Sequence, residues 1–314
     1  MSLARRSIGW TSATTPLGDT VLTTEYVRED ASILLGDARE SLSLLADQSV
    51  DCIITSPPYL GLRDYGVDGQ IGLEDTLDDY LDNLVDVFME AHRVLSDDGT
   101  FWLNIGDTYG RGSRPLAQPA QTFEKSRNKE KRPQDSRSLK LRNKSLIGVP
   151  WKLAFALQDR GWLLRSEIIW HKPNPTPEAI KDRVTRAHET VFMFSKGEKY
   201  HFDVEAIMEP NAAGDGLVRK RDVWTVQTKP YKEAHFAVFP EELIEPMVRS
   251  GCKPEGVVLD PFSGSGTTGI VALREGRKYV GLELNPEYME IQRRRLGFPD
   301  PEVELWDLGE EGAA

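Results

Sequence analysis

A glycine-rich turn between residues 256 and 269 carries the clearest chemical signal in this sequence. An apolar run at 257–259 is typical of a buried parallel strand, and Gly264, Gly266 and Gly269 follow it at the spacing of a dinucleotide-type turn. Glycines let a ligand approach the backbone closely, because they carry no side chain. No Gly-Lys-Ser/Thr sequence follows the turn, which argues against a phosphate-binding loop for ATP or GTP.

Two acidic residues narrow the choice of ligand. Glu283 ends the next predicted strand, at 278–283, where its carboxylate can accept hydrogen bonds from ribose hydroxyls. Asp260 stands directly ahead of the turn, where it would repel a pyrophosphate but attract the ammonium group of an amino acid. This combination indicates S-adenosylmethionine. The alternative is a purely structural turn in which Asp260 caps the following helix.

The second informative stretch is Ser56-Pro57-Pro58-Tyr59. Two consecutive prolines fix the backbone and remove two amide donors, so we predict a rigid loop at the end of a strand over 50–55. Open parallel sheets bind their ligands at the carboxyl ends of strands. A hydroxyl on one side of a rigid turn and an aromatic ring on the other suit a flat, polar substrate. The alternative is that the prolines only terminate the strand.

Alternating strand and helix patterns place both motifs in an α/β domain. Apolar residues recur at helical spacing from 77 to 95, Thr76 and Asp79 resemble a capping box, and Gly99 is predicted to mark the end of this helix. Further helices are predicted at 39–45, 151–157, within 236–248, at 270–274 and up to 295. Strands are predicted at 32–37, 50–55, 100–105, 166–170, 190–194, 257–259 and 278–283.

The composition predicts a globular protein of the cytoplasm. A chain of 314 residues with 39% hydrophobic residues can bury a core, no stretch is apolar enough to span a membrane, and the start lacks a signal peptide. Cys52 and Cys252 lie in or beside apolar strand patterns and are expected to be buried thiols. The five histidines show no ligand spacing, so no metal site is expected.

The sequence is acidic overall, but its basic residues are unevenly distributed. The formal net charge of −11 argues against a nucleic-acid partner, but basic residues are concentrated in an insert at 111–145. This insert has no hydrophobic period, which is uncommon in a compact domain unless the segment is functional or disordered. A basic run is also typical of a solvated surface, so the charge alone leaves DNA contact open. A second polar segment covers 197–232.

The motifs at 55–59 and 260–269, in that order, resemble those of the beta-class DNA amino-methyltransferases of bacteria, archaea and their phages. The resemblance covers about residues 25–296. It implies a class I methyltransferase fold, which is Rossmann-like, with a mostly parallel seven-stranded sheet, helices on both faces and a circularly permuted motif order. We therefore divide the chain into a loose arm at 1–20, a catalytic domain at 21–296 and an acidic tail at 297–314.

The resemblance also assigns roles to individual residues. Asp260 would hold the methionine ammonium of S-adenosylmethionine, Glu283 the ribose hydroxyls and Asp37 the adenine amine. The remaining predicted cofactor contacts are Thr55, Pro261, Phe262, Gly264, Ser265, Gly266, Thr267, Thr268 and Asn285. The family usually reads its target between the strand near 194 and the helix near 241, but this stretch is short here, so both the insert and the polar segment are candidates. Predicted DNA contacts are Arg63, Arg111, Arg114, Lys125, Arg127, Arg132, Lys140, Arg142 and Lys172.

The expected reaction is methyl transfer to the exocyclic amine of a base flipped out of double-stranded DNA. Tyr59 would stack on the base, while the Ser56 hydroxyl and the Pro57 carbonyl would accept hydrogen bonds from the amine. In this family a serine at the first motif position favours cytosine N4 and an aspartate favours adenine N6, so we predict cytosine. Methylation at cytosine C5 is not expected, because that chemistry needs a Pro-Cys nucleophile and neither cysteine follows a proline.

Three alternatives stay open at this point. The chain could methylate adenine N6, it could methylate RNA or protein, or it could bind DNA without turnover. The resemblance also leaves open a cognate restriction endonuclease as partner, and whether the protein is a monomer or a homodimer.

Overall fold

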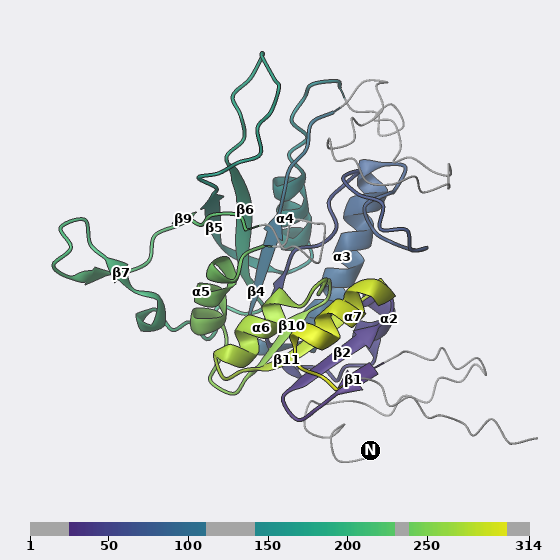
Figure 1. Ribbon diagram of the computed structural model, residues 1–314, viewed down its shortest axis with the longest axis vertical. Helices are drawn as coiled ribbons and strands as arrows, with labels where there is room; N and C mark the ends of the chain where they lie inside the picture. Colours follow the sequence, from purple (N-terminus) through teal and green to yellow (C-terminus); the bar gives the residue numbers. More distant parts are fainter. Residues whose placement is uncertain (1–24, 111–141, 230–238, 300–314) are drawn as a thin grey trace, which may run out of the picture.

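The computed structural model describes residues 25–110, 142–229 and 239–299. These form one large mixed sheet covered by helices on both faces, and a separate two-stranded sheet (Figure 1). The strands are β1 (Glu25–Val27), β2 (Ala31–Leu35), β3 (Val50–Thr55), β4 (Leu95–Ile105), β5 (Leu163–His171), β6 (His188–Ser195), β7 (Glu209–Pro210), β8 (Leu217–Val218), β9 (Val223–Thr225), β10 (Val257–Asp260) and β11 (Lys278–Glu283). The helices are α2 (Ala38–Ser43), α3 (Leu77–Val94), α4 (Val149–Asp159), η1 (Glu205–Ile207), α5 (Glu241–Gly251), α6 (Thr267–Arg274) and α7 (Pro286–Arg295).

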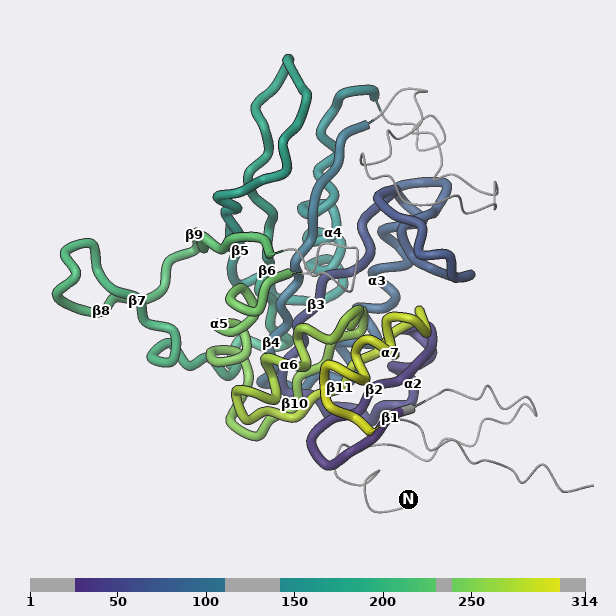
Figure 2. The backbone as a smooth tube through the Cα atoms, in the orientation of Figure 1, coloured from purple at the N-terminus to yellow at the C-terminus, as the bar shows by residue number. Residues whose placement is uncertain are grey.

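The order of strands across the large sheet is β1-β2-β11-β10-β3-β4-β6-β5-β9. The pairs from β2 through β4 are parallel, and β6 runs antiparallel to both β4 and β5. The seven strands from β2 to β5 therefore form the predicted sheet, and β1 and β9 extend it at its two edges. Figure 2 shows the C-terminal strands β10 and β11 lying between the N-terminal strands β2 and β3, as the permuted motif order predicts.

Two apolar clusters pack against opposite faces of the sheet. Phe101 and Leu103 of β4 face the layer of α2, α3 and α4, while Trp102 between them faces the layer of α5, α6 and α7. This alternation follows from the two-residue period of a strand buried on both faces. Cys52 and Cys252 both lie in the second cluster, and both are buried free thiols as predicted.

Most predicted elements are confirmed to within a few residues, and Thr76 is the N-cap of the predicted helix. Thr76 accepts from the Asp79 amide at 3.0 Å, which starts α3. The predicted end of this helix at Gly99 is wrong, because α3 ends at Val94 and Gly99 lies within β4. A side chain at Gly99 would stand 2.5 Å from the Leu95 side chain and 2.9 Å from the Asp51 carbonyl, so close packing explains this glycine.

Several sequence-based assignments fall partly or wholly outside the described residues. They are the arm at 1–20, most of the insert at 111–145, the end of the polar segment at 230–232, and the tail beyond residue 299. The two described ends of the insert pair with each other, since Gly110 donates to the Ser145 carbonyl at 2.8 Å and Lys144 donates to the Gly110 carbonyl at 2.7 Å. Within the described ranges, no helix is long and apolar enough to span a membrane, and no cluster of three metal-ligating side chains occurs.

Candidate active site

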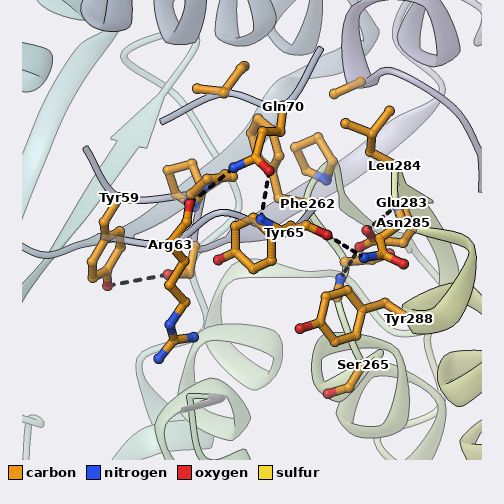
Figure 3. A pocket seen from close by; sticks show the side chains of 18 of the residues that line it. Tyr59, Arg63, Tyr65, Gln70, Phe262, Ser265, Glu283, Leu284, Asn285 and Tyr288 are labelled. Atoms are coloured by element: carbon orange, nitrogen blue, oxygen red, sulfur yellow. Dashed lines mark hydrogen bonds between the residues drawn. The ribbon is translucent and has the colours of Figure 1, made fainter. Parts of the chain in front are cut away.

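One pocket at the carboxyl edge of the central strands brings the two predicted motifs together (Figure 3). Tyr59 lies on one side of it and Glu283 and Asn285 on the other, with Arg63 and Tyr65 between them. The predicted site residues that line this pocket are Asp37, Ser56, Pro57, Pro58, Tyr59, Arg63, Lys172, Pro261, Phe262, Gly264, Ser265, Thr267, Glu283 and Asn285. Thr55, Asp260, Gly266 and Thr268 are predicted site residues that lie behind the wall.

Asp260 is buried beneath the glycine turn, with 1% of its surface exposed. Its carboxylate accepts from the Thr55 hydroxyl at 2.7 Å, the Thr268 hydroxyl at 2.7 Å and the Phe262 amide at 3.1 Å. Burial raises its pKa to about 6, against the lowering effect of these three donors. Asp260 thus joins the end of β3, the turn and the start of α6. Its direct contact with a cofactor ammonium stays a prediction.

Glu283 fixes the turn from the neighbouring strand. Its two carboxylate oxygens accept from the Gly264 amide and the Asn285 amide, each at 2.7 Å. Burial raises its pKa to about 7, so the carboxyl changes charge near neutral pH. Gly264 and Gly266 have φ of +51° and +79°, a conformation that favours glycine, and a side chain at Gly266 would approach the Gln292 side chain to 2.7 Å.

Asp37 lies at the end of β2, where it caps helix α2. Its carboxylate accepts from the Arg39 amide at 2.8 Å and pairs with the Arg39 guanidinium at 3.1 Å. Burial opposes ionisation of this carboxyl, but the hydrogen bonds from the Arg39 side chain and from backbone amides outweigh it and lower the pKa. Asp37 is therefore held as a carboxylate at the edge of the pocket.

A loop at 60–72 crosses the pocket from the proline motif toward the glycine turn. Gln70 accepts from the Tyr65 amide at 2.7 Å and donates to the Arg63 carbonyl at 3.1 Å. The Asn285 side chain donates to the Tyr65 carbonyl at 3.3 Å, and the rings of Tyr65 and Tyr288 meet edge to face at 6.1 Å. These contacts close the cofactor side of the pocket between the loop and the start of α7.

The Ser-Pro-Pro-Tyr segment is held rigidly at the other side. The Tyr80 hydroxyl of α3 donates to the Pro58 carbonyl at 2.8 Å, and the Ser56 hydroxyl lies 3.4 Å from the Tyr59 hydroxyl. Gly106 leaves room for the Tyr59 ring, because a side chain there would stand 2.5 Å from the ring. The backbone and the ring are thus both fixed by tertiary contacts.

Glu189 of β6 forms the floor on this side and was not predicted from the sequence. Its carboxylate accepts from the Tyr59 hydroxyl at 2.9 Å, from the Asn104 side chain at 3.2 Å, and from the Lys172 ammonium. Burial, and then the neighbouring Glu189 charge, raise the pKa of Tyr59 well above its usual range. The phenol therefore stays protonated and donates to Glu189.

The predicted DNA contacts fall into different places. Arg63 and Lys172 line the pocket, and Arg142 is exposed at the base of the insert. The others lie outside the described residues: Arg111, Arg114, Lys125, Arg127, Arg132 and Lys140. No DNA contact is tested by this structure, so these assignments stay predictions.

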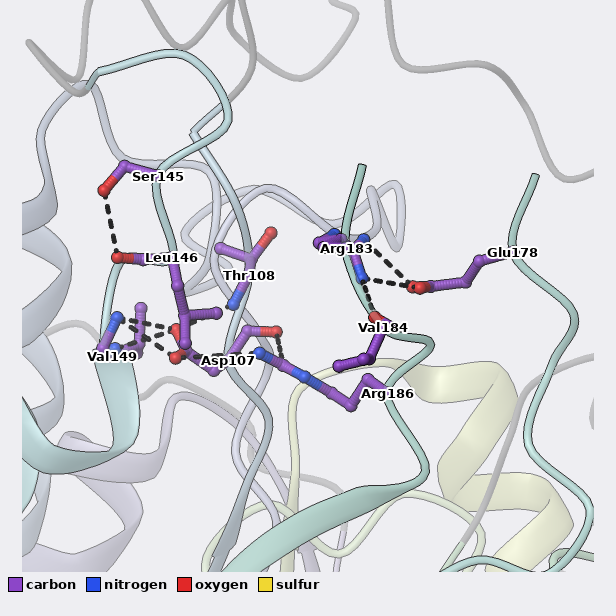
Figure 4. A network of polar contacts seen from close by, with 10 residues as sticks. Asp107, Thr108, Ser145, Leu146, Val149, Glu178, Arg183, Val184 and Arg186 are labelled. Carbon is purple, nitrogen blue, oxygen red and sulfur yellow. Dashed lines mark hydrogen bonds and ion pairs between the residues drawn. The ribbon is translucent and has the colours of Figure 1, made fainter. Parts of the chain in front are cut away.

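A polar network ties the base of the insert to the loop between β5 and β6 (Figure 4). Asp107 accepts from the amides of Gly148 and Val149 at 2.9 and 3.0 Å, which satisfies the first turn of α4. Arg186 donates to the Asp107 carbonyl, and the Arg183 guanidinium lies 3.8 Å from the centre of the Tyr109 ring. Both described ends of the insert are therefore anchored to the segment between β5 and β6. No spacing signal in the sequence points to Asp107, because it lies in an irregular segment.

The sequence and the fold agree with those of known proteins. A family model described as DNA methylase matches residues 50–294. The chain belongs to this DNA methylase family. Its membership confirms S-adenosylmethionine as the cofactor and methylation of DNA as the class of reaction.

Individual relatives cover nearly the whole chain. The type II methyltransferase M.Cfr9I of Citrobacter freundii is 52% identical over 273 residues, which are 87% of this chain and 90% of the relative. M.SmaI of Serratia marcescens is 51% identical over 84% of this chain and 90% of its own length.

Solved structures show the same architecture. The Thermus thermophilus protein TTHA0409, solved as a complex with S-adenosyl-L-methionine, has a TM-score of 0.57 at 26% identity, covering 84% of this chain and 91% of its own. PvuII DNA methyltransferase (cytosine-N4-specific) has a TM-score of 0.64 over 87% of this chain and 88% of its own, and at 24% identity this likeness shows the fold alone.

Proposed function

We propose that this DNA methyltransferase transfers the methyl group of S-adenosylmethionine to N4 of a cytosine flipped out of double-stranded DNA. The observation that carries the proposal is that Ser56 and Tyr59 line the same pocket as the glycine turn and Glu283, with Tyr59 and Glu283 on opposite sides of it (Figure 3). A cofactor held over the turn and a base stacked on Tyr59 would meet inside this pocket. Because both motifs line one pocket, the arrangement supports methyl transfer between two ligands bound side by side.

The contacts support a mechanism that depends on positioning. The amine of cytosine is a poor nucleophile, because its lone pair is delocalised into the ring. Hydrogen bonds to the Ser56 hydroxyl and to the Pro57 carbonyl would draw that lone pair out of conjugation and aim it at the methyl group. The sulfonium of the cofactor is already activated, so the chain supplies orientation and preorganised dipoles, and no covalent intermediate is needed.

The acidic residues near the glycine turn are proposed to have different roles. Glu283 and Asp37 line the pocket and are available to the ribose and the adenine of S-adenosylmethionine. Asp260 lies behind them and orders the turn through Thr55 and Thr268. In this arrangement Gly264, Ser265 and Thr267 offer the backbone and hydroxyl groups nearest the cofactor.

Binding a duplex needs a surface near the pocket, and the basic insert is the proposed one. Flipping a base costs a few kcal/mol, and stacking on an aromatic ring returns about 1–3 kcal/mol. The insert at 111–145 and the polar segment at 197–232 are the proposed target-recognition regions. A cognate restriction endonuclease, and a monomeric or dimeric state, are further expectations of this proposal.

The test is nucleoside mass spectrometry on genomic DNA from a methylation-deficient host that expresses the protein. N4-methylcytosine above the level of an Asp260→Ala control is the expected result. N6-methyladenine instead would keep the mechanism and overturn the choice of base. If neither mark rises while the purified protein still binds DNA, the alternatives are an RNA or protein substrate or DNA binding without turnover.

A further inference from the structure

The Lys172 ammonium is held in one place at the floor of the pocket. Lys172 follows the last residue of β5, and its amide donates to the Ala187 carbonyl at 2.7 Å, which keeps it in register beside β6. Its ammonium pairs with Glu189 and lies 4.1 Å from the centre of the Trp170 ring. Only 17% of the Lys172 side chain and 19% of the Glu189 side chain are exposed. A long, flexible side chain is thereby fixed beside the catalytic motif.

The carboxylate of Glu189 joins this ammonium to the residues that would hold the base. One oxygen accepts from Lys172, and the other accepts from Tyr59 at 2.9 Å and Asn104 at 3.2 Å. Three donors therefore converge on Glu189, so this carboxylate positions its neighbours. Removing the Lys172–Glu189 ion pair from water costs free energy, and such pairs often add little to the stability of the fold. This favours a role in recognition.

The chemistry of the two candidate bases suggests what the ammonium recognises. On the Watson–Crick edge of cytosine, the amine is followed by two acceptors, N3 and the carbonyl O2. On the same edge of adenine, the amine is followed by the acceptor N1 and then by a C–H group. A donor placed opposite the third position would thus pair with cytosine and leave adenine unpaired. An ammonium has three N–H donors, and Glu189 accepts from one of them.

The geometry points to Lys172 as the residue that selects cytosine, by donating a hydrogen bond to O2 of the flipped base while Glu189 holds its ammonium in position. This assignment rests on the proposed function. It makes Lys172 a specificity residue of the pocket and refines its predicted role as a DNA contact. Glu189 acts through Lys172 and Tyr59.

A substrate lacking O2 tests the assignment. The probe is a duplex that carries the methylation site mapped in the host, with the target cytosine replaced by a 2-aminopyridine C-nucleoside, which keeps the amine and the ring nitrogen. We expect the wild-type protein to lose about 10- to 100-fold in kcat/KM on this duplex, the range of one charge-assisted hydrogen bond. Equal rates on both duplexes would overturn the assignment without any variant.

A double-mutant cycle sharpens it. On the cytosine duplex, Lys172→Met should lower kcat/KM by a similar factor. On the analogue duplex, Lys172→Met should be no slower than the wild type. If the two losses multiply instead, the Lys172 ammonium and O2 of the base do not interact. Glu189→Gln should lower kcat/KM in the wild-type background and have a smaller effect beside Lys172→Met, where only its contacts with Tyr59 and Asn104 are left to disturb. Lys196→Met is the matched control, because Lys196 is also 17% exposed and paired, with Asp97 at 3.3 Å, away from the pocket.

Cofactor titration separates misfolding from a lost contact. A Lys172→Met protein that binds S-adenosylmethionine as the wild type does is folded. If Lys172→Met does not bind the cofactor, Lys172→Gln, which keeps a hydrogen-bond donor, replaces it in the experiment. If wild-type protein methylates no cytosine duplex, the proposed function fails. If it methylates cytosine normally and the losses multiply, only the assignment of Lys172 fails.

Discussion

The two sides of the pocket are built in different ways. Most of the side proposed to bind the cofactor, here called the cofactor side, comes from one short stretch of sequence, because β10, the glycine turn, α6 and β11 follow one another between residues 257 and 283. The side proposed to bind the base, here called the base side, is assembled from Tyr59 after β3, Asn104 in β4, Lys172 just after β5, and Glu189 in β6. A ligand site made by one contiguous motif can be recognised from spacing. A site made by distant strands needs the fold.

This difference predicts that the two sides can be damaged independently. Ser56→Ala removes a hydroxyl at the base side, so turnover should fall about 10²–10³-fold, the range for one preorganised hydrogen-bonding group. The affinity for S-adenosylmethionine should stay unchanged in isothermal titration calorimetry. Unchanged turnover would contradict the catalytic role of Ser56, and a weakened cofactor would contradict the separation of the two sides.

Asp260→Ala should have the opposite signature. It removes the acceptor of the Thr55 and Thr268 hydroxyls in a buried place, so the turn loses its order and the affinity for the cofactor should fall about 100-fold. Calorimetry measures this loss. Asp51→Ala is the control, because Asp51 accepts from the Val257 amide at 2.9 Å at the other end of the same strand. Equal losses in both variants would mean that only the stability of β10 was affected.

Gly106→Ala tests whether the position of the Tyr59 ring matters. The added methyl would stand 2.5 Å from the ring, so the ring must move, and kcat/KM should fall about 10- to 100-fold, since small displacements near reacting groups are costly. Steady-state kinetics with calorimetry of cofactor binding would measure it. Gly197→Ala, where the nearest atom is 3.4 Å away, should behave as the wild type. An active Gly106→Ala protein would show that the base side tolerates movement.

The smallest expected effect is a pH dependence confined to the cofactor side. Glu283 has a pKa raised to about 7 by burial, and a ribose hydroxyl prefers the ionised carboxylate. The affinity for S-adenosylmethionine should therefore rise as pH increases through 7 and level off above it, by about tenfold between pH 6 and 8 for one such group. Calorimetry across this range in the wild type and in Glu283→Gln checks it, and a slope that survives in the variant would assign the titration to another group.

The same sign argument applies to stability without ligand. A carboxyl whose pKa is raised by folding binds its proton more tightly in the folded state. Glu283 and Asp260 therefore contribute most to the stability of the folded state at low pH. That contribution is lost as pH rises from the unfolded value through about 6 for Asp260 and about 7 for Glu283. The cofactor, by binding at this turn, would offset the loss near neutral pH.

The sequence alone determined the features that short-range patterns encode, which are the glycine-rich motif and the positions of most strands and helices. The run at 257–259, the glycines after it and the next strand predicted the cofactor side, and β3 and β11 have the predicted bounds. Apolar periodicity and the capping box predicted the start of α3 at Thr76. The end of the helix was placed wrongly at Gly99, because a glycine required by packing against Leu95 resembles one that ends a helix.

Tertiary structure alone decided how the base side is made. Lys172 and Glu189 are 17 residues apart, and nothing in their spacing shows that antiparallel pairing of β5 and β6 brings them together under Tyr59. Likewise, only the tertiary structure shows that the Thr55 and Thr268 hydroxyls donate to the Asp260 carboxylate, whose contact with the methionine ammonium stays a prediction. Sequence patterns report which residues are neighbours along an element, whereas hydrogen bonds across elements depend on strand order and register.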